Sequence, residues 1–267
     1  MAFAFEPTFI DDRGMIREHL FHKRAPADPM FRWRGEAVSR LEALSDGVFA
    51  LTLALLIVTG AVPTQFYELW KTVRDLPVFL VSFAMLMMAW HYHYIFFRRY
   101  GLEDFATSIL NAAFLFLVMF LAYPLKFLAT FLWRVTLGDG DALQAMFTPP
   151  IGASFDLAGS EQRAWMMIFY ALAIIGVFGL LGLMQWRAYS KRKELELDEL
   201  EIYLTVTGIL HHLISVGVAL LSLLIILADG EPGWAGIVYF LLGPLHGVCG
   251  WLRGRRAAEL HQGLISG

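Results

Sequence analysis

Six long apolar runs, separated by charged or turn-forming segments, constrain the fold of this chain more than any other feature. A bilayer core requires about 20 mostly apolar residues for each α-helix that crosses it. Hydrophobic residues form 58% of the chain and charged residues 17%, with a mean hydropathy of +0.58, whereas soluble domains are about a quarter charged. We therefore predict an all-α integral membrane protein with six transmembrane helices, at roughly 43–62, 77–97, 105–128, 164–186, 202–228 and 233–251.

The segments between these runs predict the domain organisation. We expect an N-terminal extension at 1–35, a six-helix domain at 36–252 and a tail at 253–267. Residues 129–163 contain Gly-Asp-Gly-Asp and a Pro-Pro pair with little periodicity, which predicts an extramembrane loop. The charged segment 187–201 leaves two interpretations open, a solvated linker or an amphipathic extension of a helix.

Lys and Arg are distributed unequally between the two sides of the predicted membrane, and cytoplasmic segments of membrane proteins carry the excess. Of the 21 Lys and Arg residues, sixteen lie in four segments that would share one side: 1–42, 98–104, 187–201 and the tail. The other side holds only four: Lys71, Arg74, Arg134 and Arg163. We therefore predict that both termini, and with them the extension and the tail, are cytoplasmic.

Composition and motifs argue against several functions. Cys249 is the single cysteine, so an internal disulfide framework is excluded, and no Cys/His spacing of a zinc site is present. The net charge of −3 argues against a nucleic-acid partner, because phosphate binding requires a basic face. The sequence also lacks GxSxG, HExxH and Walker motifs, so we expect neither catalysis nor a bound metal or cofactor.

Two other membrane functions fit these features less well. A haem or metal protein would use histidines in the spans, but His91 and His93 point about 200° apart on a helix, and His211 and His212 about 100° apart. Neither pair can bind one metal from a single helix face. A secondary transporter is the stronger alternative, yet such proteins usually show inverted repeats with broken helices, and the two halves of this chain show no clear correspondence.

The first apolar run carries two stripes and a carboxylate. At 100° per residue, Leu51, Leu55 and Val58 lie in one narrow sector, and Thr52 and Thr59 form a hydroxyl stripe beside it. Either stripe is compatible with ordinary helix packing. Asp46 lies at the start of the same run, where an unpaired carboxylate would cost a few kcal/mol, so an intramembrane carboxylate indicates a functional role.

Three motifs in this part of the chain resemble those of one family, transmembrane protein 175, which comprises endosomal and lysosomal potassium channels and bacterial homologues. Arg40-Leu-Glu-Ala-Leu-Ser45-Asp46 resembles the Arg-x-x-x-Phe-Ser-Asp signature of the first helix, with leucine in place of phenylalanine. The Trp-x-x-His-x-x-x-Phe motif is matched at Trp90 and His93, and Asn111 stands thirteen residues before a proline, as in the family. The resemblance is close over about residues 36–130.

The resemblance implies a potassium-preferring channel in a bacterial inner membrane, with passive conduction and no resident cofactor besides the permeant ion. It implies a homotetramer of six-helix subunits in which the first helices line a central pore. The narrowest point would be an apolar ring at Leu51, with Leu55 and Val58 following and the hydroxyls of Thr52 and Thr59 beside the pore. Six motif residues would couple the helices without touching the ion: Arg40, Ser45, Asp46, Trp90, His93 and Asn111. A buried carboxylate needs a partner, which Arg40 or a protonated His93 could supply. Because Arg40 and Asp46 lie about 240° apart on a helix, we expect a bridge through another helix.

Overall fold

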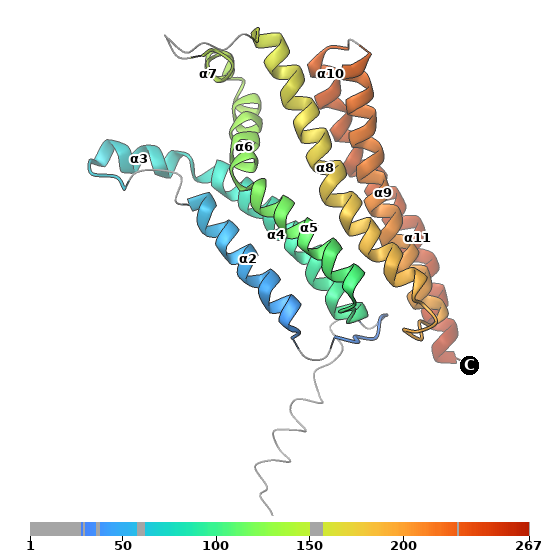
Figure 1. Ribbon diagram of the computed structural model, residues 1–267. Coiled ribbons are helices and arrows are strands. Elements are labelled where there is room, and N and C mark those ends of the chain that lie inside the picture. The colour runs from blue at the N-terminus through green and yellow to red at the C-terminus, as the bar shows by residue number, and fades with distance from the viewer. Residues whose placement is uncertain are drawn as a thin grey trace, which may run out of the picture.

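A computed structural model describes residues 28, 30–35, 38–57, 62–149, 157–228 and 230–266 of the chain. This part of the chain is built from α-helices joined by short turns, with one 3-10 turn, and forms an elongated bundle (Figure 1). The elements are α2 (Arg40–Ile57), α3 (Phe66–Arg74), α4 (Leu76–Tyr100), α5 (Phe105–Phe120), α6 (Ala122–Leu137), α7 (Gly140–Met146), α8 (Gly159–Ser190), α9 (Glu199–Leu227), α10 (Pro232–Ile237), η1 (Val238–Leu241) and α11 (Leu242–Ser266).

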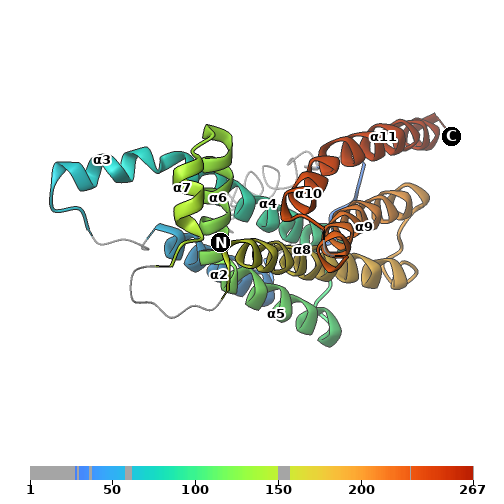
Figure 2. The ribbon, with the colours of Figure 1, turned by 90° about the horizontal axis from the view of Figure 1, so that it is seen from above.

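The long helices form two packed groups. Helix α2 lies against α4, α5 and α6, while α8 and α9 form an antiparallel pair that α10 and α11 join. Packing of α5 and α4 against α8 connects the groups. Helix α3 differs from all of these, since it runs across the direction of the bundle and projects from it, as both views show (Figures 1 and 2).

The described residues contain four helices that are long and apolar enough to cross a membrane: α4, α8, α9 and the continuous stretch Pro232–Gly263. The bent pair α5 and α6 gives a fifth if it is one span. The sequence predicted six, and the difference lies in α2. Its first two turns carry Arg40, Glu42 and Asp46, and residues 58–61, which would extend its apolar part, lie outside the described residues.

Several predicted boundaries need correction. The predicted loop 129–163 is partly helical, because α6 continues through an apolar stretch to Leu137 and ends where Gly138 adopts a left-handed φ of 66°. Helix α7 follows directly, with the Asp139 carboxylate accepting a hydrogen bond from the Ala142 N–H. In the segment 187–201, α8 runs on to Ser190 and a turn leads to α9, so the helix extension and the linker are both present. The chain after residue 252 continues as helix α11.

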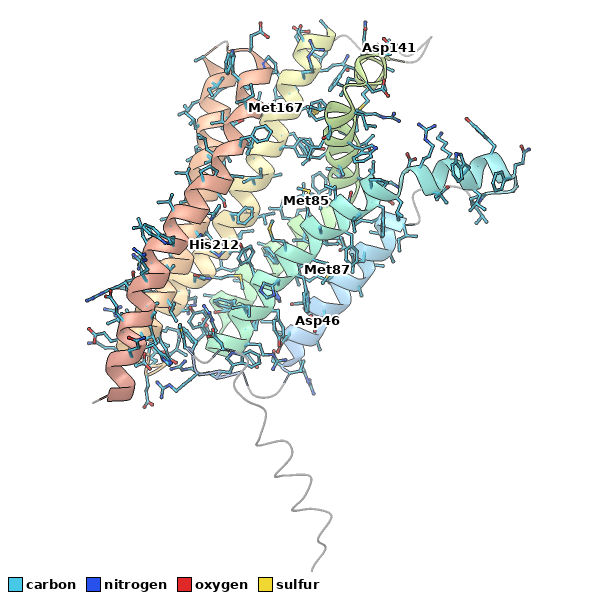
Figure 3. All side chains as sticks on the ribbon, turned by 180° about the vertical axis from the view of Figure 1, so that it is seen from behind. Asp46, Met85, Met87, Asp141, Met167 and His212 are labelled. Atoms are coloured by element: carbon cyan, nitrogen blue, oxygen red, sulfur yellow. The ribbon has the colours of Figure 1, made fainter. Side chains whose placement is uncertain are left out.

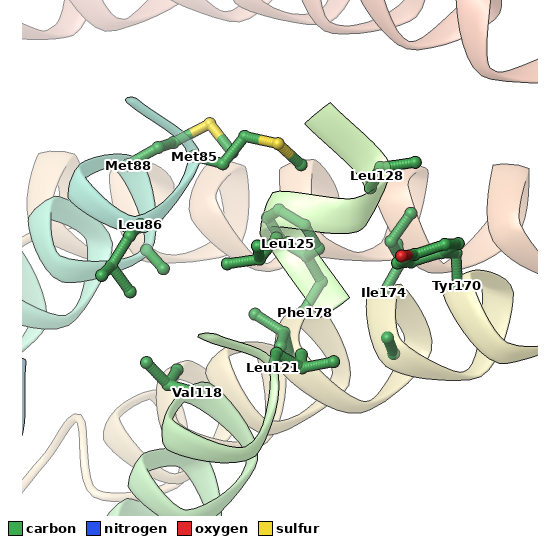
Figure 4. A pocket seen from close by; sticks show the side chains of 13 residues that line it. Met85, Leu86, Met88, Val118, Leu121, Leu125, Leu128, Tyr170, Ile174 and Phe178 are labelled. Carbon is green, nitrogen blue, oxygen red and sulfur yellow. The ribbon is translucent and has the colours of Figure 1, made fainter. Parts of the chain in front are cut away.

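The third predicted span, 105–128, is bent by 51° between α5 and α6. Pro124 lies in the first turn of α6 and has no N–H to donate to the preceding turn, which explains a break at this point. The Tyr170 hydroxyl of α8 donates to the Pro124 carbonyl over 2.6 Å and fixes the bend. A cavity of about 90 Å³ lies beside it, lined by apolar side chains of α4, α5, α6 and α8 that include Met85, Leu121 and Phe178 (Figure 4).

Candidate functional site

A chain of buried hydrogen bonds joins α2, α4 and α5. The Asn111 Nδ2 of α5 donates to the Ser45 Oγ of α2 over 3.0 Å, and its Oδ1 lies 2.7 Å from the Nε2 of His93 on α4. Because a carboxamide oxygen only accepts, His93 donates through Nε2. The Ser45 hydroxyl in turn donates to the Leu41 carbonyl. All three side chains are at most 1% exposed, so this network fixes three helices together inside the protein.

Asp46 has its own partner on α4. The Trp90 indole Nε1 donates to the Asp46 Oδ1 over 2.9 Å, and the Trp90 ring stacks on Tyr94 with 5.3 Å between ring centroids. The bridge therefore runs through another helix, but the donor is an indole. Arg40 is exposed, and among the described residues no hydrogen bond or ion pair of its side chain is seen. Figure 3 shows Asp46 at the same end of the bundle as the charged ends of α4 and α9.

A buried ion pair next to this network was not anticipated from the sequence. Glu42, 4% exposed, lies on α2 and its Oε1 is 2.9 Å from the Nη2 of Arg98 at the end of α4. The Arg98 Nη1 also donates to the Gly35 carbonyl over 2.8 Å. Glu42 falls inside the Arg40–Asp46 motif, at a position where the motif allows any residue. Its i+4 spacing to Asp46 on the same helix was the available signal that a second acidic group needs a partner.

A second set of ion pairs lies at this end of the bundle. It joins the segment before α2 to α9, and the start of α5 to α8. Glu201, fully buried in the first turn of α9, accepts hydrogen bonds from both Arg32 and Arg34, with 2.6 Å from the Arg34 Nη2 to Oε2. Asp104, which precedes α5, accepts from Arg187 of α8, with 2.9 Å from Nε to Oδ2. This hydrogen bond, with a further one from Thr107, lowers the pKa of the Asp104 carboxyl to about 2.

Helix α2 has one packed face and one open face. Thr52 is fully buried and its hydroxyl donates to the Val48 carbonyl over 2.7 Å, on the same side as the buried Phe49. Leu51 is 53% exposed and lies on the open side, and Leu55 is half-buried at the edge between the two. The predicted residues Val58 and Thr59 lie outside the described part of the chain. Leu51 and Thr52 thus lie on different faces of α2, the open face and the packed face.

The span histidines do not gather into a metal site in the described residues, where no group of three or more His, Cys, Asp and Glu side chains could hold an ion. His211 and His246 form a pair between α9 and α11, with 2.7 Å between their Nδ1 atoms. His212 packs instead against the rings of Tyr92 and Phe178 and lies far from Asp46 (Figure 3).

Comparison with known proteins gives this network a family context. The sequence model of the family described as "Endosomal/lysosomal potassium channel TMEM175" matches residues 40–122, the stretch that contains every member of the α2–α4–α5 network. A protein of Marivirga tractuosa named "Potassium channel" is 34% identical over 248 residues, which cover 91% of this chain and 98% of that protein. The chain belongs to the TMEM175 family. The resemblance inferred from the motifs is therefore confirmed, and the family is one of channels, not of enzymes.

Other TMEM175 relatives agree with this assignment. The crystal structure of a variant of the potassium channel MtTMEM175, in complex with a nanobody-MBP fusion protein, has a TM-score of 0.72 and 34% sequence identity, covering 85% of this chain and 98% of that one. A potassium channel of Chamaesiphon minutus is 33% identical over 104 residues, which cover 35% of this chain and half of that protein. The chain is thus a multi-pass, all-helical membrane protein with a TMEM175-like fold and bacterial homologues.

Proposed function

We propose that four copies of this chain form a potassium-preferring channel in which α2 lines a central pore. The observation that carries the proposal is the division of α2 into two faces. Ser45 of the motif is buried and bonded to Asn111 of α5, whereas the opposite face, with Leu51, is exposed. Helix α2 also lies within the residues that match the channel family. A ring of four subunits would cover this face by turning it toward the central axis.

In this arrangement Leu51 forms the narrowest ring, followed by Leu55 and Val58. Four leucine side chains around an axis give an apolar constriction, and such a constriction controls conduction because an ion loses hydration there without compensation. Thr52 is the adjacent hydroxyl, but its hydrogen bond to the Val48 carbonyl directs it into the subunit. We assign Thr52 a packing role. Thr59 is then the remaining hydroxyl of this stripe that we propose lies beside the pore.

The motif residues hold the pore helix in position and do not contact the ion. Ser45 and Asp46 are bound to side chains of α5 and α4, through Asn111 and Trp90, and His93 completes the buried network. Arg40 belongs to the same motif and would act at the exposed start of α2. Rotation of α2 about its axis would break these contacts together, so we propose that they couple the pore helix to the rest of the subunit.

We also propose that α2 crosses the membrane, which brings the number of spans to six, and that both termini are cytoplasmic in a bacterial inner membrane. The unequal distribution of Lys and Arg supports this orientation. The ion pairs of Glu42, Asp104 and Glu201 also lie at the end of the bundle that would face the cytoplasm. An epitope inserted at Gly140 should be accessible from outside intact cells and a tag at either terminus should not; the reverse labelling would contradict the orientation.

The channel proposal is tested by recording currents from purified protein in planar bilayers, with potassium on one side and sodium on the other. We expect single-channel currents whose reversal potential lies toward the potassium equilibrium potential. Slow, carrier-like flux without discrete openings would support the secondary transporter instead. Crosslinking of the purified protein in detergent measures the oligomer in the same sample, and a species of four subunits is expected.

A further inference from the structure

Helix α3 presents an apolar face that the described part of the subunit leaves uncovered. None of its nine residues is buried. Phe66, Leu69, Trp70 and Val73 fall within a sector of about 100° on the helix, and they are 76%, 48%, 55% and 50% exposed. The opposite side carries Lys71 and other polar residues. An exposed face of this kind in a nine-residue helix indicates a partner outside the subunit.

The lengths of the flanking helices place α3 at the outer surface of the bilayer. Helix α4 has 25 residues, which at 1.5 Å per residue gives roughly 37 Å, slightly more than the ~30 Å hydrocarbon core. Its basic end, at Arg98, lies beside Glu42 of α2 at the other surface. The chain reaches α3 after α2 has run in the opposite direction from that same level. Helix α3 therefore lies between the point where the chain leaves the hydrocarbon after α2 and the point where it enters again with α4.

The direction of α3 and its local contacts match a helix that lies in the plane of the membrane surface. It runs across the direction of the spans in both views (Figures 1 and 2). Its start is fixed locally, since the Glu68 carboxylate accepts hydrogen bonds from the N–H groups of Thr64 and Gln65. At its end the Asp75 N–H donates to the Lys71 carbonyl. The helix is thus ordered by its own caps while its apolar face stays open.

We propose that α3 is an interfacial membrane anchor whose apolar face enters the outer leaflet of the bilayer. Trp and Tyr concentrate at the level of lipid headgroups, and amphipathic helices with Trp, Phe and Leu on one face and basic residues on the other lie in this plane. Trp70 and Tyr67 fit the first pattern. Lys71 and Arg74, on or near the polar side, are placed to meet lipid phosphates. The anchor fixes the outer ends of α2 and α4 at one depth.

The anchor is tested with two labelled variants of the full-length protein in vesicles of phosphatidylcholine and phosphatidylglycerol. Cys249→Ser removes the native thiol, after which Val73→Cys places a fluorophore on the apolar face and Lys71→Cys places one about 200° away on the polar face. Fluorescence is quenched from the lipid side by spin-labelled acyl chains and from the water side by iodide. Both positions are exposed, so neither substitution removes a buried side chain.

We expect the Val73→Cys probe to be quenched several-fold more by the spin-labelled lipid than by iodide, and the Lys71→Cys probe to show the reverse order. Equal and strong iodide quenching of both probes would show that α3 lies in water, which overturns the proposal. Protection of Val73→Cys from both quenchers, together with disulfide crosslinking between subunits through that cysteine, would assign the face to a second copy of the chain and overturn it equally. Neither outcome depends on ion conduction.

Discussion

The Nε2 of His93 lies 2.7 Å from the Oδ1 of Asn111, and the same amide donates through Nδ2 to Ser45 on the pore helix proposed above. One side chain on α5 therefore bridges α2 and α4. Both ends of the bridge are buried, so neither helix can exchange this hydrogen bond for one with water. The position of α2 depends on a residue of another helix at the centre of this network.

Replacement of Asn111 by leucine should destabilise the folded protein, because the buried His93 N–H and the Ser45 oxygen both lose their partner. We expect a loss of about 1–3 kcal/mol, the usual cost of an unsatisfied buried polar group. Thermal unfolding in detergent measures it. Ser108→Ala on the same helix is the matched control, since that hydroxyl donates to the Asp104 carbonyl four residues earlier and bridges no other helix among the described residues. Equal unfolding temperatures for the two variants would show that the bridge contributes little.

Asp46 should act on folding or channel opening and not on ion selection. Asp46→Asn keeps an oxygen that can accept from the Trp90 N–H, whereas Asp46→Leu removes it, so the yield of assembled protein and the open fraction should fall more with leucine. The potassium-to-sodium permeability ratio of the channels that do open should stay near that of the unaltered protein, because the carboxylate faces α4. A large change in that ratio for Asp46→Asn would place Asp46 in the conduction path.

The ion pair between Asp104 and Arg187 should give a stability that depends on pH. Since the pKa of Asp104 is lowered to about 2 in the folded state, the folded protein binds fewer protons there than the unfolded chain. The contribution is fully present above pH ~4, the unfolded pKa, and is lost as the pH falls toward 2. Asp104→Asn should therefore lower the unfolding temperature at pH 7, and the difference should shrink below pH 4. A difference that persists unchanged below pH 4 would show that the ion pair is not its source.

The two arginines that bind Glu201 should contribute unequally. Each side chain makes two hydrogen bonds to the carboxylate. Those of Arg34 are 3.1 and 2.6 Å long and its side chain is 18% exposed, whereas those of Arg32 are both 3.3 Å long and its side chain is 62% exposed. Arg34→Gln should cost about 1–3 kcal/mol of stability, as for a partly buried charged hydrogen bond, and Arg32→Gln less than about 1 kcal/mol. Urea unfolding of the two variants compares them directly. A larger loss for Arg32→Gln would show that burial of the arginine side chain does not determine the size of the effect.

The sequence predicted the long helices well where apolar runs coincide with spans, as in α4 and α9. The bend between α5 and α6 could not be placed from hydropathy, because the run is apolar on both sides of Leu121. The motif residues could be named from the resemblance. Their pairing could not, because it depends on the rotation of three helices about their axes. Glu201 and Arg34, 167 residues apart, gave no local signal.

The same limit applies to the two stripes of α2. Periodicity placed Leu51 and Thr52 side by side, but it does not say which stripe faces the other helices. Both Thr and Leu are common at helix contacts in membranes, so residue type did not decide the matter. The structure buries Thr52 and exposes Leu51, and Thr52→Val should accordingly leave the permeability ratio unchanged.

Leu51 provides the sharpest test of the proposed pore. If four copies form its narrowest apolar ring, Leu51→Asn should relieve both the steric block and the dewetting, so conductance or resting activity should rise and discrimination against sodium should weaken, because ions pass more fully hydrated. If Leu51 instead packs against a neighbouring helix, the same change buries an unpaired amide at a cost of roughly 1–3 kcal/mol, and assembly should fall without a gain in current. Single-channel recording together with crosslinking separates these results. Normal assembly with unchanged current and selectivity would remove Leu51 from the constriction and direct the next substitution to Leu55, which lies at the edge of the same open face.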